Sequence, residues 1–194
     1  MNTLKEKQAE KQAEKQALNG VDVERLKETI GRLKEDPILA RFQFRASNRW
    51  LGGSHNCSEL RNFHGTNREY NHPEPFHLEN DEPDVLFGDD RFPNPVEYVL
   101  HALAGCLTTT LTCHAAARGI AIEQIESRLE GDLDVRGFMG LSDEVRKGYQ
   151  EIRVTMRVKA DATADQLEEL AKFSPVFDTL SKPVQVTVRI EKQA

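Results

Sequence analysis

The sequence has little cysteine and no excess of positive charge. Its 194 residues include three cysteines, Cys57, Cys106 and Cys113. Three are too few for a disulfide framework, and their spacing fits no zinc-ligand pattern. The formal net charge of −6 argues against a nucleic-acid partner, because binding nucleic acid needs a basic face.

Long apolar runs are also missing. No run approaches the roughly 20 residues that span a membrane, and the N-terminus, LKEKQAEKQ, lacks the apolar core of a signal peptide. We therefore expect a cytoplasmic protein with reduced thiols and no membrane partner.

Motifs for cofactors and metals are absent as well. There is no phosphate-binding glycine loop, no GxSxG and no HExxH. The six histidines are scattered, and no two have ligand spacing on a regular element. We expect neither a metal nor a cofactor.

The N-terminal part differs from the rest of the chain. Residues 6–17 are three copies of EKQA, which indicates either a solvated helix or a helical arm that packs on a partner subunit. Asn19-Gly20 is expected to end this helix, and a second helix is predicted from Asp22 to Glu35. We therefore divide the chain into an N-terminal helical extension, residues 1–38, and a main domain, residues 39–194.

The main domain alternates between strands and helices. Residues 39–51 predict a half-buried strand with Phe42, Phe44, Ala46 and Trp50 on one face. Further strands are predicted at 59–64, 77–79, 120–135 with a turn at Gly131-Asp132, 150–160 and 184–192. Thr163 and Ser174 are expected to cap two short helices. Amphipathic strands favour antiparallel sheets, so the fold class is α+β.

One long helix stands at the centre, over residues 94–113. Asn94 and Glu97 form a capping pattern at its start, and apolar residues occur all round it, which is typical of a buried helix. One row is small and allows another helix or a symmetry mate to approach closely: Ala102, Cys106, Thr109, Cys113 and Ala116. Dimerisation would cover such a helix.

Cys106 is the candidate for chemistry. A mid-helix cysteine is more often a small core residue than a nucleophile, and a reactive thiol needs a positive neighbour or a helix N-terminus. Because Cys106 is three turns into its helix, the charge would have to come from Arg41, Arg45 or Arg49, whose alternative role is a solvated strand face. Glu97 precedes Cys106 by nine residues, on the opposite side of an ideal helix, and capping alone accounts for it.

Residues 81–113, DEPDVLFGDDRFPNPVEYVLHALAGCLTTTLTC, resemble the signature of the OsmC/Ohr family. The shared features are an acidic-proline turn, a glycine, a P-x-P-x-E helix start, and an alanine-rich turn before a cysteine. The resemblance covers about residues 40–192. It implies an OsmC-like fold, in which antiparallel sheets surround the central helices of an intertwined homodimer.

The resemblance also implies an activity. Family members reduce organic hydroperoxides with a peroxidatic cysteine at the position of Cys106, held by an arginine and a glutamate and resolved by a second cysteine. This chain has Ser174 at the resolving position and Ser54 near the arginine position, and Glu97 sits one residue later than in the hydroperoxide reductases. The usual two-cysteine cycle is therefore impossible here, because a serine at position 174 cannot form the disulfide with Cys106.

Two functions stay open. The first is a one-cysteine or atypical thiol peroxidase, in oxidative stress defence, whose oxidised Cys106 is reduced by an external thiol. The second is a non-catalytic dimer that binds a small hydrophobic ligand near Cys106. Cys57 could resolve Cys106 in place of residue 174, or it could be an exposed loop cysteine.

Overall fold

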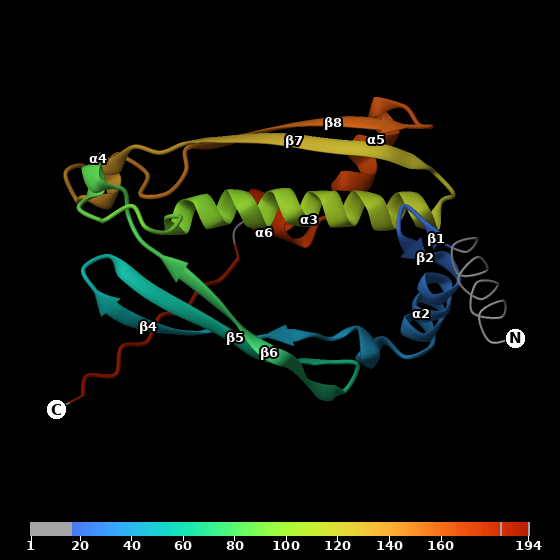
Figure 1. The fold of residues 1–194 in the computed structure, drawn as a ribbon, viewed down its shortest axis with the longest axis horizontal. Coiled ribbons are helices and arrows are strands. Elements are labelled where there is room, and N and C mark those ends of the chain that lie inside the picture. The colour runs from blue at the N-terminus through green and yellow to red at the C-terminus, as the bar shows by residue number, and fades with distance from the viewer. Residues whose placement is uncertain (1–16, 183, 194) are drawn as a thin grey trace, which may run out of the picture. The chain divides into compact units, whose positions relative to one another are not determined.

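The computed structural model describes residues 17–182 and 184–193 (Figure 1). The chain forms two compact units, the first ending at His101 and the second beginning at Ala102. Most of the predicted EKQA helix, residues 6–16, lies outside the described residues.

The N-terminal segment begins with a hairpin of β1 (Ala17–Leu18) and β2 (Val21–Asp22). Asn19 and Gly20 form its two-residue turn with φ of 56° and 76°, as a type I′ turn requires. The prediction of a helix at residue 17 that ends at this pair is wrong, because the pair is a hairpin turn. The second predicted helix is confirmed as α2 (Val23–Glu35), and a 3₁₀ turn, η1 (Pro37–Ala40), follows it.

The sheet of the first unit is built around β5 (His55–Gly65). β3 (Gln43–Phe44) and β4 (Ser47–Gly52) pair with one edge of β5, and β6 (Arg68–Asn80) pairs with the other. All pairs are antiparallel, as predicted. The short strand expected at 77–79 is the end of the long β6, which tolerates Pro73 and Pro75 because it is an edge strand with an irregular register there.

The strand predicted at 39–51 is broken into β3 and β4. Phe44 pairs with Phe63, whereas Trp50 pairs with Asn56. Positions 56 and 63 of β5 are an odd number of residues apart and face opposite sides of the sheet. Phe44 and Trp50 therefore do not share a face, and they are 75% and 74% exposed rather than half-buried.

The central helix is α3 (Pro95–Ala117), followed by the predicted stop at Arg118-Gly119. The backbone N–H of Asn94 donates to Glu97 Oε2 at 3.0 Å, and the N–H of Glu97 donates to Asn94 Oδ1 at 2.9 Å, which confirms the predicted cap. At the other end Gly119 adopts φ 75°, and the N–H of Ile120 returns to the carbonyl of Ala115.

Burial of α3 is confined to one stripe within the chain. Leu103, Leu107, Leu111 and Ala115 recur every fourth residue and are buried, together with the neighbouring Ala116. The expectation of burial all round the helix is not met, since Ala102 and Thr109 of the small row are exposed. By length and composition alone, α3 is the single helix of the described residues that could cross a membrane, and core helices of soluble proteins pass the same test.

The second unit packs helices against a two-stranded antiparallel sheet, β7 (Ile122–Asp132) and β8 (Glu151–Ala160). The connection between these strands contains α4 (Val135–Phe138). The predicted turn at Gly131 is wrong: Gly131 lies within β7, where the Tyr149 ring lies so close that a Cβ would meet it at 2.4 Å.

Two short helices, α5 (Ala164–Ala171) and α6 (Pro175–Ser181), follow β8. The capping box of Thr163 is confirmed. Leu167 and Leu170 of α5 join Leu111 and Ala115 of α3 in the buried core.

The predicted last strand, 184–192, is neither a helix nor a strand in this chain. Its alternating apolar side chains are exposed, from 57% at Val184 to 89% at Ile190. An extended segment becomes a strand only when its backbone pairs with another strand, and the described part of this chain offers it no pairing.

Candidate functional site

Cys106 lies about three turns into α3, between the buried Leu103 and Leu107 in the sequence. Its thiol is free and the residue is partly exposed. The residue is therefore neither sealed in the core nor fully in solvent.

Glu97 caps the N-terminus of α3. Its carboxylate accepts the N–H of Asn94, and the residue is exposed. Nine residues along a helix correspond to about 13.5 Å of rise, so the geometry of one helix does not pair Glu97 with Cys106. The structure assigns Glu97 a capping role.

The three candidate arginines have different surroundings in the first unit. Arg45 donates to both carboxylate oxygens of Glu69, at 2.7 and 3.0 Å. This hydrogen-bonded pair lowers the pKa of Glu69 to about 2 and raises the pKa of Arg45. Arg41 is exposed at the end of η1, and Arg49 lies on β4 directly opposite Cys57.

Cys57 is the third residue of β5 and is 8% exposed. The exposed-loop alternative is therefore wrong. Its cross-strand neighbours are Arg49 on β4 and Glu79 on β6, so the three side chains share one face of the sheet. The thiol makes a long contact of 3.8 Å with the carbonyl of Ser58.

A cluster of side chains attaches the start of α3 to this sheet. His55 Nε2 and Glu79 Oε2 are 2.7 Å apart, and the His55 ring stacks on Phe92 with centroids 5.3 Å apart. Tyr98 of α3 donates its hydroxyl to the carbonyl of Glu79 at 2.9 Å. These residues are far apart in the sequence, and no local pattern signals the cluster, because only the pairing of β5 with β6 brings it together.

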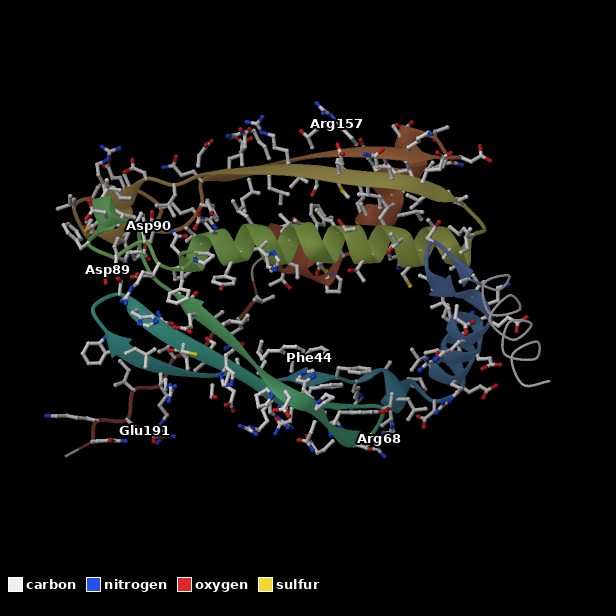
Figure 2. All side chains as sticks on the ribbon, in the orientation of Figure 1. Phe44, Arg68, Asp89, Asp90, Arg157 and Glu191 are labelled. Carbon is white, nitrogen blue, oxygen red and sulfur yellow. The ribbon has the colours of Figure 1, made fainter. Side chains whose placement is uncertain are left out.

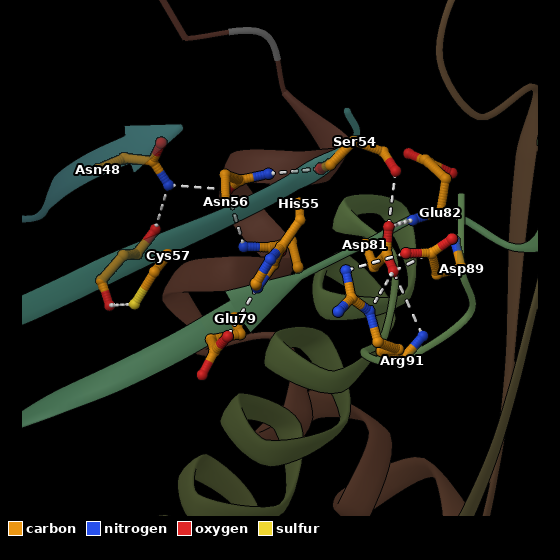
Figure 3. A network of polar contacts seen from close by, with 12 residues as sticks. Asn48, Ser54, His55, Asn56, Cys57, Glu79, Asp81, Glu82, Asp89 and Arg91 are labelled. Carbon is orange, nitrogen blue, oxygen red and sulfur yellow. Dashed lines mark hydrogen bonds and ion pairs between the residues drawn. The ribbon is translucent and has the colours of Figure 1, made fainter. Parts of the chain in front are cut away.

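The segment before α3 is organised around the buried carboxylate of Asp81, which is 1% exposed (Figure 3). Ser54 donates its hydroxyl to Asp81 Oδ1 at 2.6 Å, and the backbone N–H groups of Glu82, Asp89 and Arg91 also donate to the carboxylate. These donors favour the charged form, and they lower the pKa of Asp81 to about 2, with the Ser54 bond as the largest cause. Ser54, near the expected arginine position, thus stabilises the buried carboxylate of Asp81.

Ser174 is fully buried and caps α6, as predicted. Its hydroxyl oxygen accepts the N–H of Phe177 at 3.2 Å. Next to it, the Phe173 ring stacks on His114 of α3 with centroids 4.5 Å apart. Burial and the neighbouring Arg118 lower the pKa of His114, so the stack favours the neutral imidazole.

A scan against protein-family models matches residues 88–189 to OsmC-like proteins. This match covers more than half of the chain. The chain belongs to the OsmC-like family. Glu97, Cys106 and Ser174 lie inside the matched range, whereas Cys57, Ser54 and the three candidate arginines precede it.

Solved structures support the OsmC-like fold. An OsmC-like protein from Mycoplasma pneumoniae aligns with a TM-score of 0.54 and 16% identity, over 73% of this chain and 89% of that one. An OsmC-like protein of unknown function from Vibrio cholerae aligns with a TM-score of 0.52 and 13% identity, over 74% of this chain and 95% of that one. At these identities the likeness concerns the fold alone. A comparison with curated proteins found no relative of this sequence.

The second unit of this OsmC-like protein contains a pocket of about 440 Å³. α3, β8, α5 and α6 contribute its mostly apolar lining, which includes Leu107 but not Cys106. In the part of the chain that the structure describes, no group of three or more His, Cys, Asp or Glu side chains could hold a metal ion.

Proposed function

We propose that this OsmC-like protein reduces organic hydroperoxides through Cys106, as part of oxidative stress defence. The observation that carries the proposal is that Cys106 is a free, partly exposed thiol within the stretch that matches the family. Its place on a long helix holds the sulfur at a fixed position, which favours attack on a bound peroxide.

The proposed first step is a two-electron oxidation of the thiol. The Cys106 thiolate attacks the outer peroxide oxygen and the O–O bond breaks. The sulfur becomes a sulfenic acid, and the peroxide leaves as an alcohol after taking up a proton. Arg45 is bound to Glu69, so we propose Arg41 or Arg49 as the cation that stabilises the thiolate, from the same chain or from a partner subunit.

The second step uses an external thiol. The Ser174 hydroxyl cannot form a disulfide, and Cys57 is held within β5 with a paired strand on each side. A thiol from solution attacks the sulfenic sulfur, releases water and leaves a mixed disulfide. A second thiol then breaks this bond and regenerates Cys106, so two electrons from thiols balance the two taken by the peroxide.

We further propose that the protein is a cytoplasmic homodimer. Large apolar side chains are exposed in the single chain, among them Trp50 at 74%, Val188 at 79% and Ile190 at 89%. Exposed apolar surface of this extent is typical of an interface. The use of an external thiol suits a reducing compartment.

The experiment traps the intermediate. Reduced protein is mixed with cumene hydroperoxide and dimedone, and the modified peptide is identified by mass spectrometry. We expect the adduct on Cys106 in the wild type and in Cys113→Ser, the matched control on the same helix, and no adduct at this position in Cys106→Ser. If Cys106 of the wild type stays unmodified, the proposed peroxidase activity is refuted.

A second sample tests Cys57, in which the wild type is treated with cumene hydroperoxide and a small thiol in the absence of dimedone. Disulfide mapping of a digest prepared under non-reducing conditions would find a Cys57–Cys106 peptide if Cys57 resolves the sulfenic acid, and only a mixed disulfide of Cys106 with the added thiol if the reductant is external. Because Cys57 is 8% exposed, we expect the mixed disulfide.

A second candidate function is binding of a small hydrophobic ligand without catalysis. The apolar pocket of about 440 Å³ favours it, since this volume is within the usual range for small-molecule sites. Saturable binding of an apolar ligand, together with a Cys106 that does not react, would support this candidate over the peroxidase.

A further inference from the structure

The pocket of the second unit contains a reactive group that the chemistry at Cys106 does not use, the thioether of Met156. We propose that the pocket binds a compact, uncharged apolar molecule, and that an apolar hydroperoxide held there oxidises Met156 to the sulfoxide. The inference rests on the pocket of the second candidate function, and it requires no reaction at Cys106.

The position of Met156 follows from the alternation of β8. Val154, Met156 and Val158 point to the inner side of the strand and line the pocket, across from Leu107 and Leu111 of α3. Arg157 projects from β8 on the opposite side, away from α3 (Figure 2). The thioether therefore belongs to the inner wall and not to the outer surface of the sheet.

The charges around the pocket favour an uncharged ligand. Glu168 and Lys172 are the two charged residues of its lining. The Lys172 ammonium is paired with Glu169, which raises the pKa of Lys172. Since an acid already offsets this cation and Glu168 adds a negative charge, a carboxylate ligand would gain little.

The oxidation needs only the hydroperoxide. The Met156 sulfur attacks the outer oxygen, an S–O bond forms as the O–O bond breaks, and the alkoxide takes the peroxide proton and leaves as an alcohol. The sulfur loses two electrons and the peroxide gains them. Met156 packs against the core cluster that contains Leu111 and Leu167, so a polar sulfoxide there would disturb the packing of α5.

Met139 provides an internal control, because it is 37% exposed and does not line the pocket. Full-length Cys106→Ser is treated with hydrogen peroxide or with cumene hydroperoxide, and peptide mass spectrometry measures the sulfoxide at both methionines. We expect the ratio of Met156 to Met139 oxidation to be about tenfold higher with cumene hydroperoxide, because binding raises the local concentration of the apolar peroxide. Equal ratios with the two peroxides would overturn the proposal.

Two further measurements separate binding from simple exposure. Excess cumyl alcohol, which lacks the O–O bond, should compete for the pocket and return the ratio to its hydrogen peroxide value. Ala171→Leu should fill the pocket and have the same effect, whereas Ala40→Leu, on the exposed η1 turn, should not. If the folded protein shows no competition by cumyl alcohol, the proposal fails even where Ala171→Leu does not fold.

The result is independent of the peroxidase test. The peroxidase proposal is tested by the dimedone adduct on Cys106 in the wild type. The present proposal is tested by the sulfoxide ratio of Met156 to Met139 in Cys106→Ser.

Discussion

The Ser54 hydroxyl donates a 2.6 Å hydrogen bond to the Asp81 carboxylate, which is 1% exposed. This bond joins the turn between β4 and β5 to the segment that leads into α3 (Figure 3). The resemblance to hydroperoxide reductases suggested an arginine near residue 54. In this chain Ser54 instead anchors, through Asp81, the segment that leads into α3, the helix that carries Cys106.

Ser54→Ala should destabilise the protein, because it removes one donor from a buried charged acceptor. We expect the free energy of unfolding to fall by about 1 to 2 kcal/mol, measured by denaturant unfolding. Ser47→Ala, on exposed β4, is the matched control and should change it by less than about 0.5 kcal/mol. Equal effects of the two substitutions would mean that the Ser54–Asp81 bond contributes nothing to stability.

The contribution of the Ser54–Asp81 hydrogen bond to the free energy of unfolding should depend on pH. The pKa of Asp81 is lowered from 3.8 to about 2, so between these values the unfolded chain binds more protons than the folded one. The contribution of Asp81 is fully present above about pH 5 and is lost as the pH falls toward 2. We therefore expect the difference in unfolding free energy between wild type and Ser54→Ala to shrink between about pH 6 and pH 2.5. A difference that stays constant would contradict the pKa assignment.

Gly88 should be intolerant of any side chain. A Cβ at this position would lie 1.8 Å from the carbonyl oxygen of Glu82, which accepts the N–H of Asp90. Gly88→Ala should cost about 3 kcal/mol, because backbone must move. Gly148→Ala is the control, since its Cβ would meet nothing within 4 Å. If Gly88→Ala has the same melting temperature as the control, the backbone before α3 can rearrange to accommodate a side chain at this position.

Local signals explain what the sequence predicted well. The caps of α3 and α5 rest on residues three apart, Asn94 with Glu97 and Thr163 with Gln166. The inner and outer sides of β8 follow from simple alternation. These features need no information from distant residues.

The errors concern features that depend on distant partners. The length of β6 is set by pairing with β5, and Gly131 belongs to a strand because it pairs with Ile152 of β8. The burial of Asp81 depends on Ser54, 27 residues away, whereas an acidic residue in a turn-rich segment is normally exposed. In the candidate site, Cys106 could be singled out from its motif. The interpretation of Cys57 as an exposed loop residue was wrong, because its burial comes from pairing within the sheet.

Restoring a cysteine at position 174 tests the comparison with two-cysteine members. Ser174→Cys should cost about 1 kcal/mol through loss of the α6 cap. If the family position holds, cumene hydroperoxide should produce a disulfide between Cys106 and the new thiol. Mass mapping under non-reducing conditions checks this. Ser181→Cys, at the exposed end of α6, is the control and should give no such bond. Equal yields in both variants would refute the positional assignment.

The C-terminal segment, residues 184–192, carries a row of exposed apolar side chains. Val186 and Val188 are 76% and 79% exposed on an extended segment with alternating apolar residues. In the proposed homodimer, strand pairing would cover this apolar row, and charges placed on it would be buried at high cost. We expect the wild type to sediment at twice 22.0 kDa. The double variant Val186→Asp with Val188→Asp should shift toward the monomer mass.

The control places the same charges on the polar row of the segment. Gln185→Asp with Thr187→Asp adds two carboxylates within the same stretch but leaves the apolar row intact. This variant should keep the dimer mass, because its side chains would face solvent in a paired strand. A wild type that sediments at 22.0 kDa would refute the homodimer. Two double variants that dissociate equally would show that the net charge of the segment, and not burial of its apolar row, governs association.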